Sequence, residues 1–280
     1  MSPQQITSLQ NPRVKSVLLL QQKSSERRKT GLFVVEGQRE IQHCIEADFQ
    51  LDALFLCPEL IKEQEAGSKE QVFDRDSYLP PSLKSEGEGF PVYEVTPAVY
   101  EKMAYRGSTE GMLAVVRARH LQLSDLELGE SPLFIVLESV EKPGNLGAVL
   151  RSADAAAATA VIVCDPLTDL YNPNLIRSSI GAIFSVPCVA CTSGECIAFL
   201  RDHGVQILTA QLQDSCLYYQ TDMCRPTAIV MGTESTGLTE QWRQAATAHI
   251  RIPMLGRLDS LNVSVSAAIL LFEAVRQRRP

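Results

Sequence analysis

The chain has 280 residues, of which 45% are hydrophobic and 21% are charged. This composition is that of a globular protein and excludes extensive disorder, while the length favours two domains over one. A formal net charge of −7 argues against tight, indiscriminate binding of nucleic acid, which depends on Lys and Arg, although a localised basic face remains compatible with it.

The pattern up to residue 119 predicts a small α/β domain. In chain order we expect a helix over 14–29, a strand over 32–37, a helix over 38–47, a strand over 51–57, a polar stretch over 63–89 and a strand over 111–118. Residues 120–132 combine weak periodicity with turn residues, so we assign them as a linker between domain 1–119 and a second domain over 133–280.

From residue 133 onward, strands and helices alternate. Near-continuous apolar strands are expected at 133–140, 160–164, 186–191, 205–210, 228–232 and 249–254, and helices at 147–158, 174–184, 196–204, 239–248 and 260–279. This pattern is typical of a mostly parallel sheet with helices on both faces, so we predict the α/β class for this domain.

The last of these helices is apolar on nearly every face between Val263 and Val275. A helix inside a large core, and a helix packed between its own sheet and a second subunit, both explain this distribution. We favour the second, because no later residue of the sequence could cover the outer face.

Eight cysteines lie at irregular intervals, mostly in apolar runs, which indicates small core residues in a reducing compartment. Cys188 and Cys191 form a C-x-x-C pair, with Cys196 and His203 as possible additional ligands. Because a structural zinc site normally needs a second such pair, we expect no metal.

Neither a membrane segment nor a signal for export is recognisable. The longest apolar stretch, 264–272, is far too short to span a bilayer, and residues 1–10 lack a charged-then-apolar pattern. We therefore expect a cytoplasmic protein without a membrane partner.

Three polar loops follow expected strands, and ligands gather at the carboxyl ends of parallel strands. In the first loop, 141–154, Asn145 could cap the next helix or bind a ligand, and Arg151 could be a surface residue or a functional one. The second loop, 231–238, has glycines five apart like a phosphate-binding loop, but no Lys follows and Glu234 would repel a phosphate.

The third loop leads from the last strand into the terminal helix. We expect Ser260 and Asn262 at the entry to this helix, before its geometry becomes regular, and Ser260 could be an N-cap. Other catalytic arrangements have little support, because the four histidines form no helical pair and no G-x-G-x-x-G follows a strand.

Together, and in this order, the three loops resemble the signature motifs of the SpoU (TrmH) branch of the SPOUT RNA methyltransferases. The motifs read PGNLGAVLRSADA, IVMGTESTGL and IPMLGRLDSLNVSVSAAILLFEA, and NPNLIRSSIGAIFSVP between them also resembles the family pattern. The resemblance covers about residues 133–275. More loosely, SLQNPRVK and FVVEGQREIQHCIEA resemble the substrate-binding domain joined to many of these enzymes.

The resemblance implies a trefoil knot in the C-terminal domain, a homodimer through that domain, and S-adenosylmethionine as methyl donor. The matching motifs imply that Gly232, Ile252 and Leu261 lie at the donor, with the region of Leu208 and Thr209 contributing. The implied reaction is methylation of a ribose 2′-hydroxyl in structured RNA, with ribosomal RNA favoured over transfer RNA.

By the same resemblance, Arg151 activates the hydroxyl, and Asn145, Glu234, Ser260 and Asn262 arrange Arg151, the donor and the ribose. Positioning and proton removal are the enzyme's tasks, because a hydroxyl is a poor nucleophile until it loses its proton. Arginine is almost always protonated, so stabilising the developing alkoxide is physically easier for it than acting as a base. Both roles remain open in the sequence.

RNA would meet the basic residues of the first helix and of the intermediate stretch. These RNA-binding candidates are Arg13, Lys15, Arg27, Arg28, Lys29 and Arg177.

The chain also departs from the family pattern. Ala156, Ala157 and Ala158 stand where the family often has an aromatic residue and a glycine. The acidic residue that the family commonly has directly before the proline is shifted by one position, because Glu141 is followed here by Lys142. Both departures weaken the assignment to a subfamily. Two alternatives remain. A noncatalytic RNA-binding or ribosome-assembly factor that retains the fold would bind no donor, and a small-molecule methyltransferase would stay active without its first 118 residues.

Overall fold

The computed structural model describes residues 4–65, 89–105, 110–233 and 236–279. The chain divides into two compact units: residues up to Arg119 together with Tyr171–Arg177, and His120–Leu170 together with Ser178–Pro280. Most of the polar stretch expected over 63–89 lies outside the described residues.

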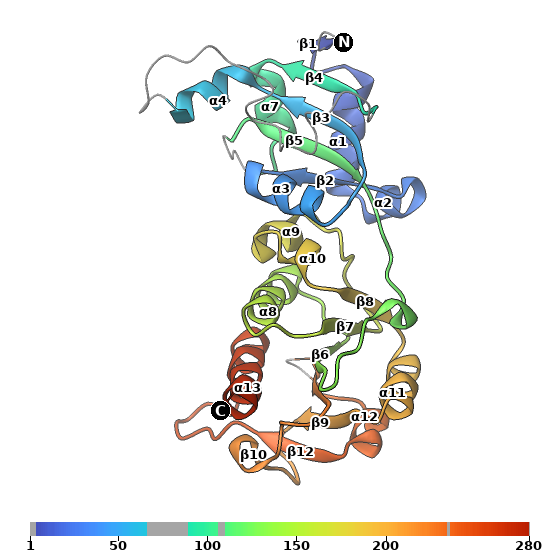
Figure 1. The fold of residues 1–280 in the computed structure, drawn as a ribbon. Helices are drawn as coiled ribbons and strands as arrows, with labels where there is room; N and C mark the ends of the chain where they lie inside the picture. The colour runs from blue at the N-terminus through green and yellow to red at the C-terminus, as the bar shows by residue number, and fades with distance from the viewer. Residues whose placement is uncertain (1–3, 66–88, 106–109, 234–235, 280) are drawn as a thin grey trace. The chain divides into compact units, whose positions relative to one another are not determined.

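The first unit is built on a mixed five-stranded sheet, ordered β1-β4-β3-β5-β2 (Figure 1). Its elements are β1 (Gln4–Ile6), α1 (Pro12–Gln22), α2 (Ser24–Thr30), β2 (Leu32–Glu36), α3 (Gln38–Glu46), β3 (Leu51–Leu56), α4 (Pro58–Glu65), β4 (Val92–Val95), α7 (Pro97–Met103) and β5 (Met112–Arg117). Strand β4 runs parallel to β1 and β3, whereas β5 is antiparallel to β2 and β3. The expected strands and the helix over 38–47 are present, and β1, β4, α4 and α7 are additional.

One expected helix, over 14–29, is in fact two. Asn11 and Pro12 begin α1, since the Asn11 side chain accepts a hydrogen bond from the Arg13 amide at 2.9 Å. The backbone of Lys23 is extended and ends the helix. Arg27 then folds back and donates to the carbonyls of Leu20 and Gln21, which satisfies groups that a helix end leaves unpaired.

The second unit contains a seven-stranded sheet, ordered β10-β12-β9-β11-β6-β7-β8, in which all neighbouring strands are parallel. Its strands are β6 (Leu133–Glu138), β7 (Ala160–Cys164), β8 (Cys188–Cys191), β9 (Gln206–Ala210), β10 (Cys216–Leu217), β11 (Thr227–Met231) and β12 (Ala248–Arg251). Its helices are α8 (Pro143–Ala155), α9 (Pro173–Ser179, shared with the first unit), α10 (Ala182–Ser185), α11 (Ser193–Asp202), α12 (Glu240–Ala245) and α13 (Val263–Arg278), with 3-10 turns at Leu123–Asp125 and Tyr218–Gln220.

Helices cover both faces of this sheet, as the alternating pattern predicted. Helices α8 and α13 pack together on one face, and α11 and α12 pack together on the other (Figure 1). The α/β class and the parallel sheet are therefore confirmed. Among the described residues, no helix is both long enough and apolar enough to cross a membrane.

Two segments differ from the expected arrangement. Residues 120–132, which we assigned as a linker, belong to the second unit, where Leu123, Leu126 and Leu128 pack against the core beneath α11 and α12. The helix expected over 174–184 is broken by Ile180 and Gly181, both with positive φ, into α9 and α10.

Candidate active site

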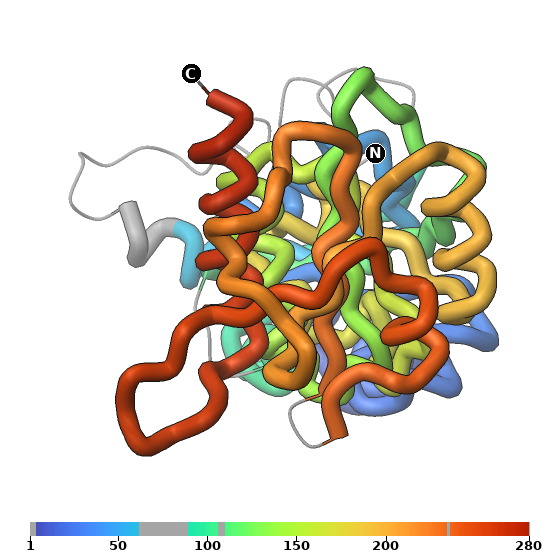
Figure 2. Tube along the Cα trace, turned by 90° about the horizontal axis from the view of Figure 1, so that it is seen from below, coloured from blue at the N-terminus to red at the C-terminus, as the bar shows by residue number. Residues whose placement is uncertain are grey.

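A cavity of about 400 Å³ lies at the carboxyl ends of β9, β11 and β12. Most of its lining comes from three chain regions: 210–213 at the end of β9, the residues on either side of the turn after β11, and the stretch from the end of β12 into α13. Arg243 of α12 also lines it. Figure 2 shows the segment that joins β12 to α13 as a long projecting loop. The volume falls within the roughly 300–1,000 Å³ that is usual for small-molecule sites.

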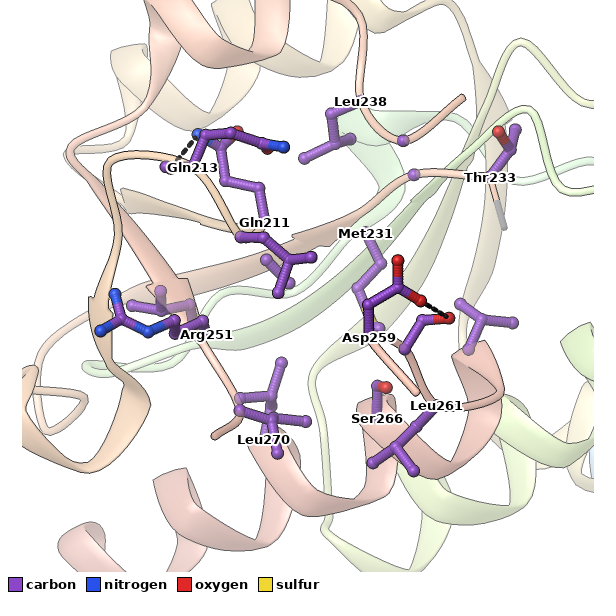
Figure 3. A pocket seen from close by; sticks show the side chains of 18 of the residues that line it. Gln211, Gln213, Met231, Thr233, Leu238, Arg251, Asp259, Leu261, Ser266 and Leu270 are labelled. Carbon is purple, nitrogen blue, oxygen red and sulfur yellow. Dashed lines mark hydrogen bonds between the residues drawn. The ribbon is translucent and has the colours of Figure 1, made fainter. Parts of the chain in front are cut away.

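The cavity has an apolar lining with polar groups among it. Met231 comes from the end of β11, Leu238 from the turn that follows and Leu270 from α13 (Figure 3). Its polar lining includes Gln211, Arg251 and Asp259, together with further amide, hydroxyl and guanidinium side chains. An apolar wall with a few polar side chains is the usual composition of a site for an organic ligand.

Gly232 brings two backbone segments unusually close together. A Cβ atom at this position would lie 2.3 Å from both the carbonyl carbon and the oxygen of Gly237, and 2.5 Å from the amide nitrogen of Leu238. Gly237 itself has φ of +68°, a conformation that favours glycine. The turn after β11 therefore presents bare backbone to the cavity, with no room for a side chain at Gly232.

A second cavity, of about 130 Å³, adjoins the first, because Gly232, Thr233 and Val263 line both. Its remaining lining comes from β6 and the turn into α8, including Lys142 and Asn145. The two cavities together join the ends of β6, β9, β11 and β12.

Asn145 and Asn262 connect the first loop with the third. The Asn262 amide donates to the Asn145 side-chain oxygen at 3.2 Å, although the two residues are 117 positions apart. Asn262 is also the N-cap of α13, where its oxygen accepts from the Ser264 amide at 2.9 Å. Asn262, and not Ser260, caps α13, whereas Lys142 is the N-cap residue of α8 and Asn145 lies within that helix.

The other predicted catalytic residues are arranged less closely. Ser260 lines the large cavity, and its hydroxyl donates to Asp259 at 3.3 Å. Arg151 is exposed on α8 and is not one of the described residues that line either cavity. Glu234 lies outside the described residues.

The predicted donor residues divide into two groups. Gly232, Ile252 and Leu261 line the large cavity. Leu208 and Thr209 are fully buried within β9 and do not line it, whereas the next residues, Ala210 and Gln211, do. The Thr209 hydroxyl is instead paired with His249 at 2.6 Å.

Most of the predicted RNA-binding residues are at the surface. Arg13, Lys15, Arg28 and Lys29 are exposed in the first unit, as is Arg177 at the end of that unit's second segment. Arg27 is only 5% exposed, and its contacts with backbone carbonyls assign it a structural role.

Several cavity residues were missed from the sequence. Met231 and Leu238 flank the glycine turn, and Leu270 lies two helical turns into α13. All three lie within the quoted motif sequences, but as apolar residues they are interpreted from the sequence as ordinary core residues.

A fully parallel sheet with a cavity of mixed apolar and polar lining at its carboxyl edge, and a smaller cavity beside it, is typical of an α/β enzyme domain that binds a small organic ligand. The family comparison specifies this further. Residues 132–272 match the model of the SpoU rRNA methylase family, and residues 11–114 match that of an MRM3-like substrate-binding domain. The chain belongs to the SpoU rRNA methylase family.

Individual relatives and solved structures support this assignment to the family. A 23S rRNA (guanosine-2′-O-)-methyltransferase, RlmB, of Vibrio parahaemolyticus is 35% identical over 68% of this chain and 79% of its own. The crystal structure of an RNA 2′-O ribose methyltransferase is 35% identical, covers 98% of this chain and 99% of its own, and has a TM-score of 0.79. An AdoMet-bound rRNA methyltransferase from Sinorhizobium meliloti is 29% identical, with 98% and 97% covered and a TM-score of 0.84.

Proposed function

We propose that this protein transfers a methyl group from S-adenosylmethionine to a ribose 2′-hydroxyl of 23S ribosomal RNA. The observation that carries the proposal is the convergence of the three motif loops: the Asn145–Asn262 contact, the Gly232 turn and Leu261 lie at two adjoining cavities. A relative with 35% identity is named for this reaction on 23S rRNA.

The large cavity suits this donor. Its apolar wall of Met231, Leu238 and Leu270 fits an adenosine, and the bare backbone at Gly232 permits close approach of a flat ring. The lining contains one carboxylate, Asp259, and two guanidinium groups, Arg243 and Arg251, so it is compatible with a donor that has both cationic groups and a carboxylate. When bound, the donor supplies an electrophilic methyl on a sulfonium, so the protein has to orient it and to prepare the nucleophile.

The second cavity is the position we assign to the target ribose, because it shares a wall with the first. Asn145 and Asn262, which are hydrogen-bonded to each other, would orient the sugar there. For Arg151 we propose an electrostatic role, in which the guanidinium stabilises the alkoxide as the hydroxyl loses its proton.

We further propose that the protein works as a homodimer through α13 and that the segment from β12 to α13 threads a trefoil knot. Leu270 and Leu271 of α13 face the chain's own core, yet Val265 and Phe272 are each 47% exposed on the same helix. Burying these side chains against a second copy removes apolar surface from water. Arg151 lies exposed on α8, which packs on α13, and we propose that in this dimer Arg151 acts at the ribose bound to the partner.

Phe272→Asp is expected to convert the dimer to a monomer, because a charge would be buried in an apolar contact. Sedimentation velocity measures the change, and methyl transfer should fall with it. Leu167→Asp is the matched control, since Leu167 is 63% exposed on the loop after β7 and should leave the dimer intact. A Phe272→Asp protein that remains dimeric contradicts the assigned interface.

We assign the binding of ribosomal RNA to domain 1–119 and methyl transfer to the domain over 133–280; residues 120–132, which pack with the second unit, connect the two. The match of residues 11–114 to a substrate-binding model supports this assignment, as do the exposed basic residues of α1 and α2. Because its proposed substrate is ribosomal RNA, we place the protein in the cytoplasm.

Replacing Lys15, Arg28 and Lys29 together by Glu should weaken binding to 23S rRNA and flatten its salt dependence. Each lost phosphate contact lowers the slope of log K against log salt by about 0.7–0.9. Filter binding over a series of salt concentrations measures this, and donor affinity serves as the internal reference. Lys102→Glu, an exposed lysine on α7, is the control. An unchanged slope in the triple variant would place the RNA on another surface.

The proposed reaction is tested with purified protein, deproteinised 23S rRNA and S-adenosylmethionine labelled in its methyl group. The label should appear in a 2′-O-methyl nucleoside after digestion of the RNA. Label on a base would contradict ribose as the acceptor. If calorimetry at high micromolar donor detects no binding, the noncatalytic assembly factor is the better account.

A further inference from the structure

Three cysteines from three different elements meet in the second unit. Cys164 ends β7, Cys191 ends β8 and Cys196 lies in the first turns of α11, and their sulfur atoms all lie within 4.8 Å of one another. Cys164 and Cys191 are directly paired across the two parallel strands, so their side chains leave the same face of the sheet. We call these residues the thiol cluster.

The C-x-x-C pair of the sequence does not form this cluster. Cys188 and Cys191 are an odd number of positions apart in β8, so their side chains point to opposite faces, and Cys188 is paired with Val161. Cys164, and not Cys188, lies beside Cys191 in the cluster. Cys164 is 27 positions before Cys191, so no short sequence motif links the two.

From this geometry we propose that the thiol cluster is a binding site for a thiophilic d10 cation, with Zn²⁺ as the cation it takes in the cell. Thiolate sulfur is the ligand that selects such ions. Zinc at about 2.3 Å from each of three sulfurs in tetrahedral geometry needs sulfur separations of roughly 3.8 Å. The three sulfurs here are separated by no more than 4.8 Å. Rotation about the Cα–Cβ bond of each cysteine would bring the sulfur atoms to the separation that zinc needs.

The surroundings leave the three sulfurs as the donor set. The nearby carboxylates are already engaged: Asp165 accepts from the Ser193 hydroxyl at 2.6 Å, and Glu195 accepts from the Thr192 amide at 2.8 Å. Their negative charges still favour approach of a cation to this edge. Cys164 and Cys196 are fully buried, whereas Cys191 is partly exposed, so the fourth coordination position opens towards solvent beside Cys191.

The proposed site is distinct from the donor cavity. The thiol cluster lies at the carboxyl ends of β7 and β8, on the face covered by α11, and none of its cysteines lines either cavity described above. A cation there would tie β7, β8 and α11 together and stabilise the folded state in proportion to its concentration. Because the cluster lies away from both cavities, we expect the cation to stabilise the fold without taking part in methyl transfer.

The test uses the full-length, reduced protein after treatment with a chelator. Titration with Zn²⁺ against a chromophoric chelator should show one bound ion per chain and a raised melting temperature. Cys191→Ala should weaken binding by more than about 100-fold, beyond the cost of losing an outer-sphere partner. Cys188→Ala, a buried cysteine on the opposite face of the same strand, should bind Zn²⁺ like the parent protein.

Alkylation followed by mass spectrometry gives a second readout that does not depend on a variant. Zn²⁺ should protect Cys191, whereas the exposed thiols Cys216 and Cys224 should react equally with and without the ion. Zinc uptake that is equal in Cys191→Ala and the parent protein would overturn the proposal. The absence of stoichiometric uptake, or a disulfide formed within the cluster in place of metal binding, would overturn it too.

Discussion

Arg151→Ala should reduce kcat for methyl transfer by on the order of 10²–10⁴-fold and leave the affinity for S-adenosylmethionine unchanged. The size of the loss follows from removing a group that acts on the hydroxyl or its alkoxide in the transition state. Donor affinity should be retained because the proposed contact of Arg151 is with the ribose hydroxyl and not with the donor. Single-turnover kinetics with labelled donor and calorimetry measure the two quantities separately.

Arg151→Lys is the informative companion to this variant. Lysine keeps the positive charge but loses the planar guanidinium, so partial recovery of kcat supports an electrostatic role. Full activity in Arg151→Ala would refute the role assigned to this residue, and loss of donor binding would place the residue at the donor.

Gly232→Ala should weaken donor binding by on the order of 10- to 100-fold, because an overpacked methyl group costs about 1–3 kcal/mol. The added Cβ would lie 2.3 Å from the backbone of Gly237, so the turn that forms part of the cavity has to open. Calorimetry gives the affinity and a thermal melt reports any loss of stability.

Gly256→Ala is the matched control for this substitution. Gly256 lies in the loop before α13, where an added Cβ meets nothing within 4 Å, so donor affinity should not change. An unchanged affinity in Gly232→Ala would mean that the donor does not use the turn after β11. Heterodimers of Gly232→Ala with Arg151→Ala should regain activity, since Arg151 of one chain would serve the intact donor cavity of the other.

Much of the second unit's fold could be predicted from its strands. Strands β6 and β7 are buried at every position, and all their residues except Glu138 at the end of β6 are apolar, because helices cover both faces of a parallel sheet. The expectation that Asn262 precedes regular helix was also correct, since it caps α13. Local sequence patterns sufficed in these cases, because strand burial and helix capping both depend on residues that are close together in the sequence.

Features that depend on contacts distant in sequence could not be predicted. The break of the first helix at Lys23 depends on Arg27 folding back to two carbonyls, and periodicity contains no sign of that contact. The pairing of Asn145 with Asn262 spans 117 residues, and the family resemblance, not the spacing, brought these two residues together. Cys164 joined the thiol cluster only through the register of β7 against β8.

The most direct test of the account is a map of 2′-O-methylated nucleotides across all RNA from cells with and without this protein. We predict that one ribose in 23S rRNA loses its methyl group in the absence of the protein, and that expression of the parent chain restores it while Arg151→Ala does not. Identical maps from the two cell types, or restoration by Arg151→Ala, would contradict the account.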